Sequence, residues 1–109
     1  LRRWPEALAT AQKLVTQDPG SAPSWLALAV AASGGGRHDV ALDAAQRAAG
    51  IDPTSPAAYR LLAVAQTHFP THRRHAYRTA RYAVALDPDD QVWYRYRPTG
   101  EWVRIDGTL

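Results

Sequence analysis

Three histidines in the second half of the sequence are the residues best suited to bind a metal. His68, His72 and His75 carry imidazole nitrogens, and the last two are three residues apart. Pro70 predicts a turn that separates His68 from the other two, and no carboxylate accompanies the set. Because a zinc site needs convergent ligands held by ordered hydrogen-bond partners, we expect no metal and no cofactor.

A basic face is the second candidate for chemistry. Arg74, Arg78 and Arg81 are spaced by four and then three residues, so they share one side of a helix, with Tyr77 beside them. Arginine interleaved with tyrosine can contact phosphates and stack on bases. A charged run on a helix is more often a solvated outer surface. Of the possible partners of this basic face, an acidic protein surface is favoured over nucleic acid.

Residues for covalent or acid–base catalysis are scarce. The sequence has no cysteine, and Glu6 and Glu101 are its only glutamates. No serine, histidine and acid stand in a pattern typical of nucleophilic catalysis. Gly34-Gly35-Gly36 follows a helix-forming stretch and lacks the Lys-Ser or Lys-Thr that completes a phosphate-binding loop, so it predicts a turn between helices. We therefore expect that the chain is not an enzyme.

An internal repeat must position these residues. Asp-Pro occurs at Asp18-Pro19, Asp52-Pro53 and Asp87-Pro88, so the prolines are 34 and then 35 residues apart. Trp25 and Tyr59 occupy equivalent places after the first two of these breaks. The stretches between are rich in alanine, the residue with the highest helix propensity, and each unit contains one internal turn. Each unit therefore predicts a pair of helices.

The repeat divides the chain into a helical part and a tail. We expect helical repeats over residues 1–90, with the second helix of one repeat at 4–17 and full repeats at 22–53 and 56–88. Residues 91–109 leave the repeat, because Arg97 and Pro98 follow where a helix interior should continue. Near alternation of aromatic and β-branched residues around Pro98-Thr99-Gly100 predicts a β-hairpin there.

These spacings resemble the tetratricopeptide repeat (TPR) family, whose pattern is W-x2-L-G-x2-Y, then A-x3-F, then P. The matching residues are Trp25, Leu28, Ala29, Ala41, Ala45 and Pro53, then Tyr59, Leu62, Ala63, Ala76, Ala80 and Pro88, preceded by Ala7, Ala11 and Pro19. Alanine replaces the family's glycine and phenylalanine, and Ala32 and Gln66 replace its tyrosine. The resemblance implies a mainly α fold, a right-handed α-solenoid of helix-turn-helix repeats, here with a short C-terminal β-hairpin.

The resemblance also implies a concave groove, lined by the first helices of successive repeats, that holds a protein or peptide. The positions carried over to this sequence are Leu26, Val30, Ser33, Arg60, Val64, Thr67 and His68. They are mostly apolar, and Arg60 alone has the chemistry of the carboxylate clamp found in some family members. The resemblance thus favours an apolar peptide or helix as the ligand. The alternative is that these residues pack against neighbouring helices.

The aromatic tail has two interpretations. An isolated hairpin is marginally stable in water, so it would cap the last apolar face of the helices. The alternative is an interface, formed by Tyr94, Tyr96 and Trp102, through which the chain associates with itself or with a following domain.

Composition sets the remaining expectations. The net charge is +3, and the longest apolar run, Trp25 to Ala32, is far shorter than the roughly 20 residues that span a bilayer. We expect a soluble protein without membrane contact, in the cytoplasm rather than secreted, and part of a longer polypeptide. Its expected function is that of a scaffold or adaptor for protein–protein interaction.

Overall fold

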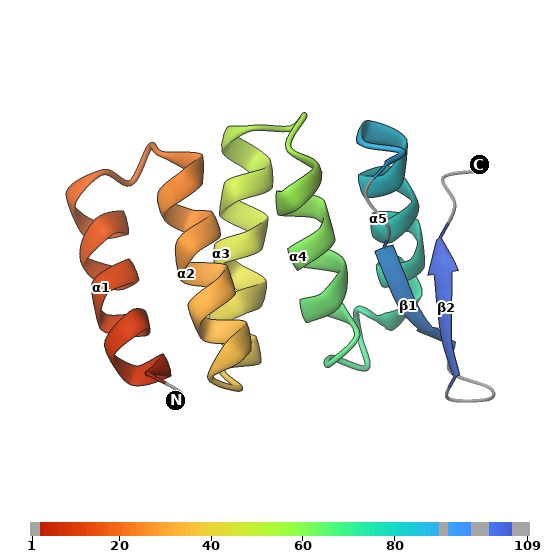
Figure 1. The fold of residues 1–109 in the computed structure, drawn as a ribbon, viewed down its shortest axis with the longest axis horizontal. Helices are drawn as coiled ribbons and strands as arrows, with labels where there is room; N and C mark the ends of the chain where they lie inside the picture. The colour runs from red at the N-terminus through yellow and green to blue at the C-terminus, as the bar shows by residue number, and fades with distance from the viewer. Residues whose placement is uncertain (1–2, 90–91, 97–100, 106–109) are drawn as a thin grey trace.

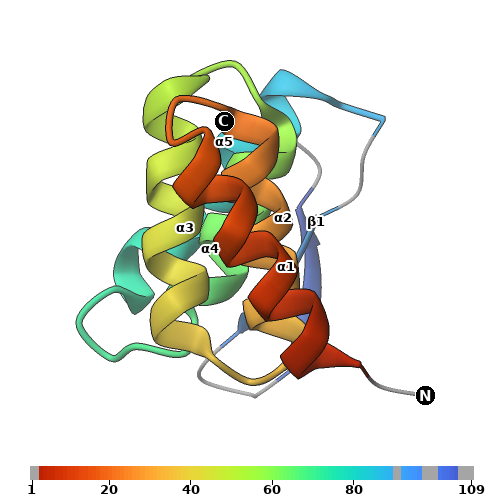
Figure 2. The same ribbon diagram turned by 90° about the vertical axis from the view of Figure 1, so that its left-hand side faces the viewer.

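Five helices follow one another in the computed structural model, which describes residues 3–89, 92–96 and 101–105. They are α1 (Trp4–Gln17), α2 (Ala22–Gly34), α3 (His38–Ile51), α4 (Pro56–Gln66) and α5 (Arg73–Leu86). Each helix packs against the next in a row of alternating direction, and α2 also contacts α4 (Figure 1). Figure 2 looks along the row with α1 nearest the viewer. The prediction of a mainly helical chain is confirmed.

The Asp-Pro breaks mark the ends of α1, α3 and α5. Asp18, Asp52 and Asp87 each follow the last helical residue and donate a backbone N–H to the carbonyl four residues earlier, at 2.9, 2.9 and 3.1 Å. The proline after each aspartate has no N–H to continue the helix. Gly36 makes the turn from α2 to α3 with a φ of 78°, a conformation that favours glycine.

Alanine forms most of the helix–helix contacts. Ala44, Ala45 and Ala48 of α3 are completely buried, as are Ala76 and Ala80 of α5. Larger side chains are sparse in this core, and Leu28 and Leu62 join Val15 and the alanines in one packed cluster. Small side chains let the helices approach closely, so the core depends on tight packing rather than on bulky residues.

In each full repeat, an aromatic residue of the first helix contacts the second helix at the equivalent position. The guanidinium carbon of Arg47 lies 5.1 Å from the centroid of the Trp25 ring. The indole Nε1 of Trp25 donates a hydrogen bond to the Pro19 carbonyl at 2.8 Å. One repeat later Tyr59 meets Tyr82 edge to face, with centroids 4.6 Å apart. Burial raises the pKa of Tyr59, and Tyr82 and Asp52 raise it further.

A second pair of contacts also recurs with the repeat. The indole of Trp4, at the start of α1, lies over Gly34 at the end of α2. The residues 34 positions later, His38 and His68, are also in contact: their rings stack with centroids 3.6 Å apart. The internal repeat seen in the sequence therefore extends to side-chain packing.

Two glycines in helical backbone predict opposite effects of alanine. A Cβ at Gly34 would fall inside van der Waals contact of the Trp4 ring, whereas one at Gly50 would meet no atom within 4 Å. Gly34→Ala is expected to lower the free energy of unfolding by about 1 kcal/mol, because the indole must move. Gly50→Ala is expected to raise it by about 0.5–1 kcal/mol through helix propensity. Urea unfolding followed by circular dichroism measures both, and equal effects would contradict the Trp4 contact.

Two strands follow the helices. β1 (Val92–Tyr96) pairs antiparallel with β2 (Glu101–Ile105), with Tyr94 opposite Val103, and β1 lies beside α5 (Figure 1). The predicted turn at Pro98-Thr99-Gly100 lies outside the described residues. Within the described part of the chain, no helix is long and apolar enough to cross a membrane.

Candidate functional site

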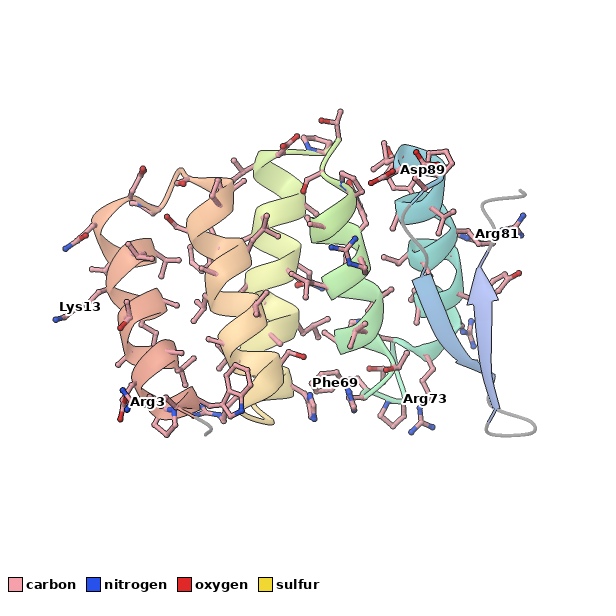
Figure 3. The ribbon with its side chains drawn as sticks, in the orientation of Figure 1. Arg3, Lys13, Phe69, Arg73, Arg81 and Asp89 are labelled. Atoms are coloured by element: carbon pink, nitrogen blue, oxygen red, sulfur yellow. The ribbon has the colours of Figure 1, made fainter. Side chains whose placement is uncertain are left out.

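An apolar groove of about 680 Å³ runs along α1, α2 and α4. Its lining residues are Trp4, Ala7, Thr10, Ala11 and Leu14 from α1, Pro23, Leu26, Ala27, Val30 and Ala31 from α2, and Ala57, Arg60 and Leu61 from α4. We call these residues the apolar groove. Among the described residues that line it, Arg60 alone is charged. Lys13, although it belongs to α1, points away from the other helices (Figure 3).

Two large apolar side chains stand open to solvent in this groove. Val30 is 50% exposed and Leu14 is 41% exposed. Single exposed apolar residues are common on protein surfaces, but apolar residues that gather in a concavity are typical of binding sites. The groove can therefore bury an apolar ligand, while the Arg60 guanidinium can donate hydrogen bonds at its α4 wall.

The structure brings together only part of the predicted groove. Leu26, Val30 and Arg60 line it, whereas Ser33, Val64, Thr67 and His68 are not among its lining residues. Val64 is nevertheless 36% exposed. The prediction missed every lining residue of α1, and also Pro23, Ala27 and Ala31 of α2 and Ala57 and Leu61 of α4. Those of α1 were not predicted because the resemblance assigns groove positions to first helices only. The apolar residues at helical spacing in α1, Ala7, Ala11 and Leu14, were the available signal.

His68 and His72 pack against different rings. The His68 ring stacks on His38 with an interplanar angle of 12°, while His72 meets Phe69, with centroids 6.1 Å apart. Imidazole lone pairs lie in the ring plane, so two parallel stacked rings cannot both direct a nitrogen at one ion. Among the described residues, no three His, Cys, Asp or Glu side chains are placed to hold a metal.

The His38–His68 stack predicts a pH-dependent stability. Burial lowers the pKa of His68 below its usual 6.5, and the neighbouring His38 lowers it further. Because the unfolded chain binds the proton more tightly, His68 contributes stability above pH 6.5 that is lost as the pH falls through its folded pKa. We expect ¹H–¹⁵N NMR titration to show His68 titrating below 6.5, and His38→Asn to move its pKa upward. Titration of His68 at or above 6.5 would contradict the stacked geometry.

The three arginines of the basic face do lie together. Arg74, Arg78 and Arg81 line a concavity of about 460 Å³ on α5, with Tyr77 and Tyr82. The Arg81 guanidinium lies 5.5 Å from the Tyr77 ring centroid. Tyr77 and Tyr82 are each 44% exposed, so aromatic faces and cations are presented on one surface. This arrangement suits an anionic ligand.

The third candidate surface is the aromatic tail. Tyr94 and Tyr96 belong to β1 and Trp102 to β2, but their side chains lie outside the described part of the structure.

Neither comparison with known proteins assigns the chain to a family: no protein-family model matches it, and no curated protein is significantly similar to it.

Proposed function

We propose that this chain is a protein-interaction module, built as a TPR-like solenoid, that holds an apolar peptide or helix in the apolar groove. The observation that carries the proposal is the exposure of Val30 and Leu14 within one concavity lined by three helices. Support for the TPR-like architecture comes from α1, α3 and α5, which have 14 residues each, and from the side-chain contacts that recur with the repeat.

The groove lining determines which ligands suit it. Its walls are almost entirely hydrocarbon, so affinity would come from burying apolar side chains. One guanidinium, that of Arg60, adds a polar contact at the edge of the ligand. A ligand with several carboxylates would leave most of its charge without a partner in the groove, which disfavours it.

Site-specific photo-crosslinking tests this function. A photoreactive phenylalanine analogue is placed at Val30, in the groove, or at the equivalent but non-lining Val64. Illumination in cells is expected to attach a polypeptide at position 30 in higher yield than at position 64, and mass spectrometry identifies it. Equal yields at the two positions, or no adduct at position 30, would argue against the groove as the binding site.

The concavity on α5 supports a second candidate, binding of an acidic protein surface or of nucleic acid by the basic face. Its arginines and tyrosines line one concavity. If this function holds, affinity for poly-glutamate or single-stranded DNA falls steeply with salt, and Arg74→Gln with Arg78→Gln weakens it. Salt-independent binding would exclude this candidate. Self-association through the tail remains a third proposal, tested by sedimentation of Trp102→Ala.

A further inference from the structure

Arginine and tyrosine alone, among the described residues, line the concavity of about 460 Å³ on α5. Their spacing of three, one, three and one residues places them on one face of the helix. We call this set the Arg–Tyr face: Arg74, Tyr77, Arg78, Arg81 and Tyr82. α5 contains no acidic residue, so no carboxylate of the helix itself offsets the three positive charges.

The internal repeat shows that the fold does not require these residue types. α3 aligns with α5 at a shift of 35 residues, the distance between the Asp-Pro breaks that follow them. Asp39 stands at the position of Arg74. Asp43 stands at the position of Arg78 and pairs with Arg47 at 3.0 Å. Two acidic positions of one repeat are thus basic in the next, and the packing that the repeats share does not account for the change.

The counterpart positions are open even in a helix that has a neighbour on each side. α3 packs between α2 and α4, and its Asp39, Asp43 and Gln46 are nonetheless exposed. α5 likewise lies between α4 and β1 (Figure 1). The exposure of the Arg–Tyr face therefore does not depend on a missing neighbour.

Contacts within the chain hold both tyrosine rings in place. Tyr82 meets Tyr59 edge to face, with centroids 4.6 Å apart. The guanidinium carbon of Arg81 lies 5.5 Å from the centroid of the Tyr77 ring. Tyr77 and Tyr82 each remain 44% exposed. Because these rings are already ordered, a flat group that stacks on one of them costs little further conformational entropy.

We propose that the Arg–Tyr face binds single-stranded nucleic acid, with guanidinium groups on phosphates and a tyrosine ring stacked on a base. Proteins that bind single strands combine these two features, because every nucleotide offers a phosphate and a π-face. The carboxylates of an acidic peptide would meet the arginines but leave the faces of the rings uncovered. The exposed rings therefore favour nucleic acid over the acidic protein surface that the sequence alone favoured. The proposal rests on the second candidate function, which it narrows to one class of ligand, and is independent of the apolar groove.

A dye-labelled oligothymidine of about 12 nucleotides serves as the probe, within the site sizes usual for single-strand binders. Fluorescence anisotropy follows its binding to the 109-residue chain, and saturation is expected. Three phosphate contacts predict a slope of about −2 for log affinity against log salt, at about −0.7 for each contact. Arg74→Gln with Arg78→Gln should weaken binding at least about tenfold. Lys13→Gln with Arg37→Gln removes the same charge elsewhere and should change it less than about threefold.

Tyr77 tests the role of stacking. Its counterpart in α3 is Leu42, so Tyr77→Leu removes the ring in favour of a side chain that the repeat accommodates. Affinity for the oligothymidine should fall about tenfold, the size of one lost stack of a base on an aromatic ring. Tyr77→Phe keeps the ring and should stay within about twofold. Circular dichroism checks that each variant retains the helical content of the parent chain.

Two further ligands of the unaltered chain decide between the classes of partner. An abasic oligonucleotide of the same length should bind about tenfold more weakly than the oligothymidine, because it offers phosphates without bases. Equal affinities for these two, or tighter binding of poly-glutamate of equal charge, would overturn the proposal and leave an acidic protein surface as the second candidate function. Absence of saturable binding to any of the three would overturn both. The adduct at Val30 reports on the apolar groove and is unaffected by these outcomes.

Discussion

Replacing Val30 with lysine is expected to weaken binding of the polypeptide captured at position 30 about 100-fold, or about 2.7 kcal/mol. Val30 is 50% exposed in the free chain, so a lysine can extend into water there and the fold should be unaffected. An apolar ligand that covers the groove would force the ammonium out of water without a counterion. Lysine is preferred to glutamate, because Arg60 lines the same groove and would pair with a carboxylate.

Val64→Lys is the control for this substitution. Val64 is the repeat counterpart of Val30 and is 36% exposed, yet it does not line the groove. Binding measured by isothermal titration calorimetry should change less than threefold in Val64→Lys, and the circular dichroism of both variants should match that of the parent chain. Comparable losses in the two variants would mean that the ligand lies elsewhere on the helices.

The helical architecture was accessible to sequence reasoning because its signals are local. Asp18, Asp52 and Asp87 end helices through the proline that follows each of them, a restriction that acts within a few residues. Alanine content set the helix propensity, and the periodic spacing of apolar residues set the buried face. The contact of Trp4 with Gly34 was not predicted, since it joins the start of one helix to the end of the next.

The groove was predicted only in part, because a concavity depends on where neighbouring helices end as well as on which residues face it. Leu26, Val30 and Arg60 follow from the repeat pattern. Leu14 does not, because its repeat counterpart, Ala48, is fully buried and indicates a core position. Leu14 is exposed because none of the described helices packs on that side of α1. The residues of α1 themselves do not indicate whether a helix packs there.

The largest loss of stability is expected from truncating Leu28, the leucine of the repeat pattern in α2. Leu28→Ala is expected to lower the free energy of unfolding by about 2–5 kcal/mol. Leu28 is 5% exposed and packs in the cluster that contains Val15, Ala44 and Ala45. Most of the other buried residues in this cluster are alanines, whose short side chains have no rotamers with which to fill the cavity that truncation leaves. The loss of stability should therefore include nearly the full cost of an unfilled cavity.

Leu14→Ala tests whether this loss comes from burial or from the change of residue type. Leu14 is also a helical leucine but is 41% exposed, so its truncation removes less buried surface than Leu28→Ala does and should lower the free energy of unfolding by only about 1 kcal/mol. Urea unfolding monitored by circular dichroism compares the two variants. A domain of this size is stable by about 5–15 kcal/mol, so the upper end of the Leu28 range would leave a large unfolded fraction in a marginal fold. Similar losses of stability in the two variants would show that the face of α1 is already covered in the free chain. The α1 wall of the apolar groove could then not bind a ligand.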